Sequence, residues 1–369
     1  MSDLSPLQRL HRQAGAVFGQ WQGQSVPLRF GDVADEYRAV RERAGIIDWV
    51  TCGAIEVRGV DRVAFLHNLL TQDIKRLAPG RAALVTPTAK VLADLLVVAE
   101  SDAHWLLTDR SRVETVRATL DRYVISEVVE LIDRSNELTT LAIQGPASSR
   151  VLHAAFPRTC QPEGPLTHLR VEDNGASLLV VEATITGQAG YVLLVPIDRA
   201  AELWQRLLTA GRDFGAMPVG WDALNALRIE SGIAWYGADI DESNLLPETG
   251  LERDAISEAK GCYVGQEIIA RMLTYGSANR KLMGLLIDGE IVPVIASPIM
   301  KDSETIGTVT SACWSFALRR PIAMGYVKRP LYEPGNRVDI VAGDARLAST
   351  IVARPIVPAM EAGRTLERA

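Results

Sequence analysis

Hydrophobic positions in the first 215 residues follow strand-like and helix-like spacings in a layout that occurs twice. A helix over 34–44 comes first. The first unit is predicted as a strand at 54–58, a helix from an Asp61 cap to Leu70, and strands at 82–86, 91–99 and 104–108. It ends in a helix to about Tyr123, which opens with a capping box at Ser111–Glu114. The second is predicted as a strand at 141–144, a helix carrying Val151 and Leu152, strands at 177–185 and 190–195, and a helix from an Asp198 cap to Gly211. The repetition indicates an internal duplication, with α+β lobes at about 45–135 and 138–215.

The hydrophobic pattern changes twice after the second unit. A helix is predicted from about Val219 to Ser231, closed by Gly232, within a helical and loop segment over 219–278. From 281 onward, short strand-like runs are separated by Gly and Pro, which favours a small β-barrel. We therefore expect one region over 5–278, a barrel domain over 279–357 and a flexible tail over 358–369.

Composition limits the class of protein. The chain has 369 residues, of which 47% are hydrophobic and 23% charged, as in a soluble protein of about two to three domains. The net charge of −6 argues against non-specific binding to nucleic acid or to an anionic membrane. The four cysteines and five histidines are scattered, so no metal site is predicted. The chain shows neither a secretory signal nor a membrane-spanning run, so a cytoplasmic location is expected.

The segment Lys260–Glu267, which reads Lys-Gly-Cys-Tyr-Val-Gly-Gln-Glu, places a thiol where a loop becomes a helix. Helical spacing begins directly after it, and Gly276 is the expected stop. A helix N-terminus and the nearby Lys260 would both favour the reactive thiolate form of Cys262. The alternative is a small buried residue in a tight turn, because free cysteine is among the most buried residue types.

Asp94 interrupts an otherwise apolar strand over 91–98. A buried carboxylate costs free energy unless it is partnered or protonated. Asp94 is therefore a hydrogen-bonded structural group, a site group with an altered pKa, or a residue exposed at a sheet edge.

Arg228 falls within the apolar stripe of the helix predicted after 219. An arginine in that position pairs with a carboxylate, binds an anionic ligand, or extends its charged end to solvent. Tyr236, just beyond this helix, is either a core residue or a stacking surface.

Several segments resemble the glycine-cleavage T-protein (aminomethyltransferase) superfamily. The run Val219–Ile240 is similar to that superfamily's "LRLEAG…YG.D" signature. The other similar segments are Ala39–Asp48, Leu141–Pro146 and Gly307–Val327. The octapeptide Lys260–Glu267 resembles the hallmark of the YgfZ branch, whose folate-binding proteins are linked to the maturation of iron–sulfur enzymes and to tRNA modification.

The resemblance implies three domains in a ring, two related α+β lobes and a C-terminal β-barrel, with tetrahydrofolate in the central channel. It implies that Asp94 lies near the reactive folate nitrogen and acts as acid or base, that Arg228 and Tyr236 contact the folate, and that Cys262 is the functional thiol. A carboxylate can orient an amine and carry a proton, and an arginine can pair with the anionic folate tail.

Two positions depart from the T-protein pattern. Ala93 replaces the first of two aspartates, and Val192 stands where a "Gly-Tyr-Glu" strand would supply a glutamate to the pterin. Together with the octapeptide, these departures favour a YgfZ-like, tetrahydrofolate-binding accessory protein for iron–sulfur cluster assembly or repair, with iron–sulfur enzymes as clients. The alternative is a tetrahydrofolate-dependent aminomethyltransferase or methyltransferase, including a specialised demethylase. A third possibility is an interaction scaffold without a ligand.

Overall fold

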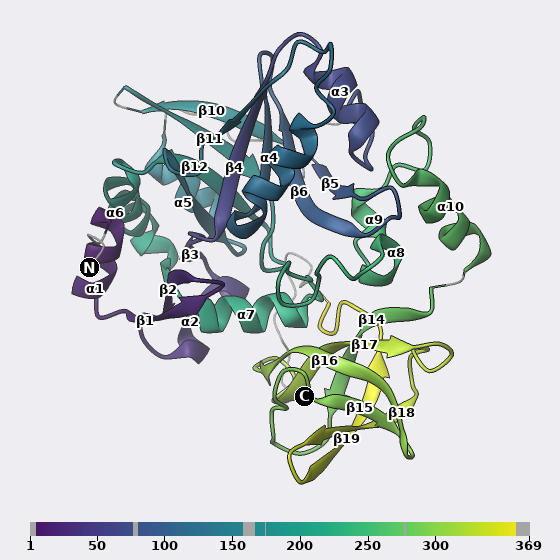
Figure 1. Ribbon diagram of the computed structural model, residues 1–369. Coiled ribbons are helices and arrows are strands. Elements are labelled where there is room, and N and C mark those ends of the chain that lie inside the picture. Colours follow the sequence, from purple (N-terminus) through teal and green to yellow (C-terminus); the bar gives the residue numbers. More distant parts are fainter. Residues whose placement is uncertain (1–4, 77–79, 158–166, 174, 277, 359–369) are drawn as a thin grey trace.

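The computed structural model describes residues 5–76, 80–157, 167–173, 175–276 and 278–358. Two mixed α/β lobes lie together above a closed barrel, and a helix, α7 (Trp221–Glu230), lies between the lobes and the barrel (Figure 1). The predicted α+β class and the C-terminal barrel are confirmed. None of the described helices combines the length and the apolar character needed to cross a lipid bilayer.

The first lobe is built on a five-stranded sheet in the order β5-β6-β7-β4-β8. Its strands are β4 (Cys52–Arg58), β5 (Gly80–Val85), β6 (Val91–Ala99), β7 (His104–Asp109) and β8 (Glu130–Asp133). Two helices, α3 (Arg62–Leu69) and α4 (Val113–Asp121), pack apolar side chains such as Phe65 and Val116 onto Ile55 and Leu95 of the sheet. Burial of this amphipathic face is what stabilises such short helices.

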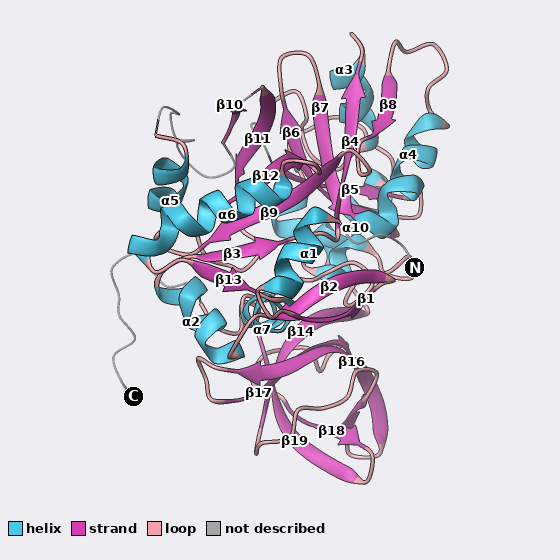
Figure 2. Cartoon of the chain, turned by 90° about the vertical axis from the view of Figure 1, so that its left-hand side faces the viewer, coloured by secondary structure: helices cyan, strands magenta, loops and turns pink. Residues whose placement is uncertain are grey.

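The second lobe repeats the strand order. Its six-stranded sheet has the order β10-β11-β12-β9-β3-β13, so β10-β11-β12-β9 matches β5-β6-β7-β4 of the first sheet. The strands are β3 (Gly45–Asp48), β9 (Leu138–Gln144), β10 (His168–Asp173), β11 (Ala176–Glu182), β12 (Gly190–Pro196) and β13 (Met217–Val219). Two helices, α5 (Ser148–Ala155) and α6 (Ala200–Gly211), lie together on one side of this sheet (Figure 2). The shared order agrees with a duplicated unit.

Short segments complete the region before the barrel. They are α1 (Pro6–Gln13), β1 (Val17–Trp21), β2 (Gln24–Arg29), α2 (Val33–Glu42), α8 (Leu246–Thr249), α9 (Glu252–Ala255) and α10 (Gln266–Tyr275). The helix expected after the octapeptide is α10, and Gly276 ends it with a φ of 61°.

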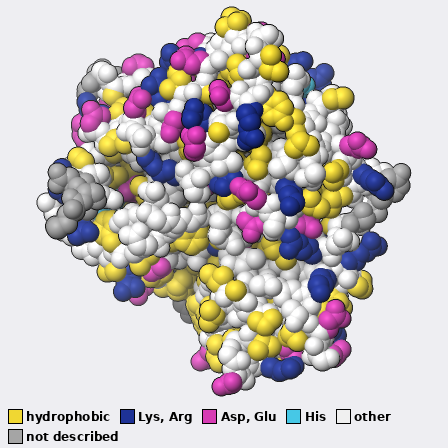
Figure 3. All heavy atoms as spheres, viewed as in Figure 1, with side chains coloured by type: hydrophobic (Ala, Val, Ile, Leu, Met, Phe, Trp, Pro, Cys, Tyr) yellow, Lys and Arg dark blue, Asp and Glu magenta, His cyan; other side chains and the backbone are white. Residues whose placement is uncertain are grey.

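Six strands form the closed barrel, in the order β14-β17-β16-β15-β18-β19 with β19 pairing back to β14. They are β14 (Arg280–Ile287), β15 (Pro298–Lys301), β16 (Glu304–Ser315), β17 (Arg320–Lys328), β18 (Arg337–Ala342) and β19 (Ala345–Val352). On the face shown in Figure 3, acidic and basic side chains are interspersed over both lobes and the barrel.

Three expected helix starts differ from the structure. Asp61 precedes α3 but its carboxylate accepts a hydrogen bond from the Val128 amide at 2.7 Å instead of capping the helix. A 3-10 turn over Arg110–Arg112 precedes α4, and the Asp109 carboxylate, not a Ser111 capping box, accepts the Ser111 amide at 2.9 Å. Helix α6 begins at Ala200 without a side-chain cap from Asp198. The Asp61 carboxylate is thus used by a neighbouring loop, and Asp109 caps the 3-10 turn in place of Ser111.

Candidate active site

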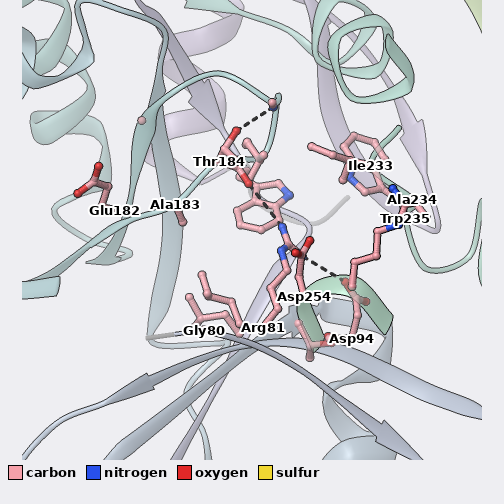
Figure 4. Close-up of a pocket in the computed structure, with 18 of the residues that line it drawn as sticks. Gly80, Arg81, Asp94, Glu182, Ala183, Thr184, Ile233, Ala234, Trp235 and Asp254 are labelled. Carbon is pink, nitrogen blue, oxygen red and sulfur yellow. Dashed lines mark hydrogen bonds and ion pairs between the residues drawn. The ribbon is translucent and has the colours of Figure 1, made fainter. Parts of the chain in front are cut away.

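A cavity of about 790 Å³ lies between the two lobes and the segment that follows α7. Such a volume suits a ligand of cofactor size. Apolar walls come from Trp49, Leu96, Leu107, Ile185, Ile233 and Trp235, and polar or charged groups from Gln72, Arg76, Arg81, Asp94, Thr108, Asp109, Glu182, Thr184, Gln188, Arg253 and Asp254. Figure 4 shows Arg81 and Asp94 on one wall, with Thr184 and Trp235 facing the same space.

Asp94 lies on β6 with its side chain 23% exposed, toward the cavity. The Arg81 guanidinium is 4.0 Å from its carboxylate, and the Thr108 hydroxyl donates to the Asp94 backbone carbonyl at 2.8 Å. Burial raises the pKa of Asp94 above its usual range, and Arg81 works against that rise. A cavity carboxylate with a raised pKa is suited to accept and return a proton.

Arg81 reaches from the first lobe toward the second. Its Nη2 is 3.5 Å from the Thr184 carbonyl oxygen, and its Nη1 is the atom nearest Asp94. Both contacts are long for hydrogen bonds, so the guanidinium keeps donor capacity toward the cavity. The sequence pattern did not single out Arg81. It lies beside Asp94 because Ala83 pairs with Asp94 across β5 and β6, which makes Arg81 the diagonal neighbour on the same face.

Arg228 does not line the cavity. Its side chain is 1% exposed and is paired with Asp239, and it donates to Ser311 Oγ at 2.7 Å and to Asn225 Oδ1 at 2.9 Å. Its guanidinium lies 4.6 Å from the centre of the Trp235 ring, and Trp235 is a wall residue. Of the alternatives for Arg228, the internal salt bridge is the one present. Arg228 therefore contacts the cavity only indirectly, by packing against the wall residue Trp235.

Tyr236 is also buried behind the wall. The Arg112 guanidinium lies 4.5 Å from the centre of its ring, and its hydroxyl has no hydrogen-bond partner among the described residues. Burial raises the pKa of Tyr236 to about 12, so the phenol stays protonated at neutral pH. Of the predicted site residues, Asp94 alone contributes to the cavity wall.

Cys262 is exposed and lies outside the cavity lining. Lys260, which was expected to favour its thiolate, instead points to the end of α3, where its ammonium group donates to the carbonyl oxygens of His67, Leu70 and Gln72, the last two at 2.6 and 3.0 Å. Cys262 also precedes the first residue of α10 by four positions, beyond the helix's first turn. The charge of Lys260 is thus directed to α3, and the helix begins four residues after Cys262.

Packing accounts for much of the octapeptide. Lys260 satisfies carbonyls that a helix end leaves without donors. Gly265 has a φ of 81°, and a Cβ there would lie 2.8 Å from the Thr86 carbonyl oxygen, so the turn needs glycine. Among the described residues, no group of three or more His, Cys, Asp or Glu side chains is placed to hold a metal ion.

Comparison with known proteins decides the family. Residues 7–256 match the GCVT N-terminal domain, and residues 280–357 match the glycine cleavage T-protein C-terminal barrel domain. The chain belongs to the glycine cleavage T-protein family.

Curated relatives match this T-protein family member over nearly all of its length. It is 30% identical over 358 residues to the aminomethyltransferase of Halothermothrix orenii, covering 96% of this chain and 99% of the relative. It is 31% identical over 356 residues to that of Geobacillus kaustophilus, covering 95% and 97%. The glycine cleavage system aminomethyltransferase T from Bartonella henselae has the same fold, with a TM-score of 0.87 at 24% identity over 96% of this chain and 98% of that structure.

These relatives correct the leading functional prediction. The YgfZ-like accessory role in iron–sulfur cluster assembly, with its links to client enzymes and tRNA modification, is wrong, because the similar full-length proteins are named aminomethyltransferase. The octapeptide misled the prediction because its lysine and its second glycine are explained by the packing of the loop against α3 and Thr86. The findings favour the alternative, a one-carbon transferase.

Proposed function

We propose that this chain is a tetrahydrofolate-dependent aminomethyltransferase whose reaction takes place in the cavity between the lobes. The observation that carries the proposal is Asp94, a carboxylate with a raised pKa on the wall of a cavity of about 790 Å³. The full-length relatives named aminomethyltransferase supply the reaction class.

The residues present fit a reduced folate. Trp49 and Trp235 provide flat apolar surface for a pteridine and an aryl ring, which is the usual lining of cofactor pockets. Arg76 and Arg253 are exposed residues of the cavity lining and offer cations for the carboxylates of a glutamyl tail. Arg228 is not proposed for that tail, because its charge is already used by Asp239.

Bound tetrahydrofolate would supply the amine nitrogens that accept the one-carbon unit. Asp94 is the acid and base: in its ionised form it accepts a proton from an amine in the cavity, and in its neutral form it returns one to the departing amine. The raised pKa brings the two forms closer in population near neutral pH than for an ordinary aspartate. Arg81 keeps the ionised form available by opposing the effect of burial.

Turnover of an aminomethylated donor in the presence of tetrahydrofolate tests the proposal, with release of ammonia as the readout. We expect the wild-type protein to release ammonia from the aminomethylated donor. Asp94→Asn should lose activity by a factor of about 10² to 10⁴, the usual contribution of a positioned acid or base. The matched control is Asp288→Asn, since Asp288 is exposed on the barrel domain and pairs with Arg320 and Arg337. No turnover by the wild type, or full activity of Asp94→Asn, would reject the proposal.

A further inference from the structure

A second carboxylate, that of Asp109, lies on the cavity wall beside Asp94. Leu96 on β6 pairs with Leu107 on β7, and the same register two residues further on sets the two aspartates opposite each other. The Thr108 hydroxyl, which donates to the Asp94 carbonyl oxygen at 2.8 Å, joins the two strands at this end. Both leucines and both aspartates line the cavity, so they share one face of the sheet. Opposite residues of an antiparallel pair have Cβ atoms about 4.5–5.5 Å apart, so the two carboxylates are neighbours.

One oxygen of the Asp109 carboxylate is held and the other is open. Oδ1 accepts the Ser111 amide at 2.9 Å and the Ser111 hydroxyl at 2.6 Å. Oδ2 makes no hydrogen bond within the described part of the chain, and it is not buried. Because Asp109 is a residue of the cavity lining, a ligand in the cavity can reach this oxygen.

The wall around Asp109 is short of positive charge. Arg81 lies 4.0 Å from the Asp94 carboxylate, whereas no Lys, Arg or His of the described ranges forms a salt bridge with Asp109. Burial raises the pKa of Asp109, while hydrogen bonds and Arg112 oppose that rise by favouring the ionised form. Arg112 is itself paired with Glu242 at 2.6 Å. A partly buried carboxylate without a countercharge of its own is stabilised by a cationic ligand.

We propose that Asp109 determines specificity for the amine of the one-carbon donor, its Oδ2 accepting hydrogen bonds from the donor's primary ammonium group and from the ammonium product. This inference rests on the proposed function and names the chemical group of the donor that is recognised. The departing amine exchanges a proton with Asp94, so it lies within hydrogen-bonding distance of that residue and next to the carboxylate opposite. A primary ammonium carries three N–H donors and can contact both carboxylates, whereas a methyl group has none. The site therefore favours aminomethyl donors over methyl donors.

Inhibition of turnover by ammonium chloride measures binding at this site, with sodium chloride at the same ionic strength as the reference. Turnover is followed by the formation of the one-carbon derivative of tetrahydrofolate. We expect ammonium to inhibit the wild type more strongly than sodium does. Asp109→Asn should raise the inhibition constant for ammonium by roughly tenfold or more, because hydrogen bonds to a charged group are lost. The KM for the aminomethylated donor should rise by a similar factor with little change in kcat, since proton transfer stays with Asp94.

Two further variants separate this role from a structural one. Asp109→Ala also removes the charge, and it should show the same rise in the inhibition constant. Asp102→Asn, in the exposed turn between β6 and β7, is the matched control and should leave that constant unchanged. Tetrahydrofolate binding, measured by calorimetry, should be unchanged in all three variants.

The outcomes distinguish this inference from the proposed function. An equal inhibition constant in wild type and both Asp109 variants would overturn the role of Asp109 while leaving the proposed function standing. Equal inhibition of the wild type by ammonium and sodium, or loss of tetrahydrofolate binding in the Asp109 variants, would do the same. Absence of turnover by the wild type would overturn both.

Discussion

At the scale of single residues, the balance between burial and one guanidinium sets the behaviour of Asp94. Burial disfavours the ionised carboxylate and raises its pKa, while Arg81, 4.0 Å away, lowers it. The group that carries the proposed proton transfers is thus tuned by a residue from the neighbouring strand. Because each of the two opposing effects can be changed separately, the pH dependence of the reaction reports on this pair.

Replacement of Arg81 by methionine should move the acid limb of the kcat/KM profile to higher pH. Loss of the positive charge leaves burial unopposed, so the pKa of Asp94 rises further and less of it is ionised at a given pH. Arg81→Lys keeps the positive charge, so its acid limb should lie close to the wild-type pH. The control is Arg150→Met, an exposed residue on α5. An acid limb that stays in place in Arg81→Met would contradict the assignment of Asp94.

At the scale of elements, Lys260 connects the loop before α10 to the end of α3. Its ammonium group is buried and donates to three carbonyl oxygens there. One of these belongs to Gln72, which lines the cavity. Lys260 therefore holds in place both the end of α3 and the backbone of a residue that lines the cavity.

Lys260→Met should lower the free energy of unfolding by about 3 kcal/mol, because buried carbonyls lose their donor. The pKa of Lys260 is lowered to about 8 by burial, below the value of about 10.4 expected in the unfolded chain. Between these pH values the unfolded chain binds the extra proton, so this residue makes the wild type more stable as the pH rises. The difference in stability between wild type and variant should therefore grow from pH 8 to pH 10 in urea titrations.

Lys90→Met is the control for Lys260→Met, since Lys90 is exposed. It should change neither the stability nor its pH dependence. A stability difference between wild type and Lys260→Met that shrinks over this pH range would contradict the role of burial at Lys260.

The pairing of Arg228 with Asp239 connects α7 to the barrel, because Asp239 also accepts the hydroxyls of Thr310 and Ser311 on β16 at 2.6 Å. Arg228→Met should lower the free energy of unfolding by about 3–5 kcal/mol, since it leaves a buried carboxylate unpaired. The double variant Arg228→Met, Asp239→Asn should recover part of that loss. Urea titration measures the free energy of unfolding of both variants. A decrease below about 1 kcal/mol in Arg228→Met would contradict a buried salt bridge between Arg228 and Asp239.

The sequence predicted the helices and strands better than it predicted which side chains from different elements contact each other. Hydrophobic periods of 2 and 3.6 residues located the main strands and helices. The short strand-like runs separated by Gly and Pro after 281 located the barrel. The proximity of Arg81 to Asp94 depends on the register between β5 and β6, which local periodicity does not specify. The buried contacts of Arg228 include a hydrogen bond to Ser311 on β16, 83 residues away, which the spacing within its own helix does not specify.

At the scale of the whole molecule, the cavity exists because two lobes of the same strand order face each other and the segment after α7 closes the space between them. Asp94 comes from the first lobe, Gln188 from the second, and Ile233 and Trp235 from the closing segment. A ligand held there would contact all three parts. Binding in this cavity is therefore the claim on which the proposed function depends.

The most direct measurement is a calorimetric titration of tetrahydrofolate into wild type and Ile233→Trp, a variant that fills the cavity from the closing segment. Val292→Trp, on an exposed loop of the barrel, is the control for adding an indole. We predict one site per chain in wild type and in Val292→Trp, and loss of binding by at least tenfold in Ile233→Trp, since a packed cavity does not accept added volume. Equal binding by all three proteins would place the folate elsewhere, and no binding by the wild type would contradict the account as a whole.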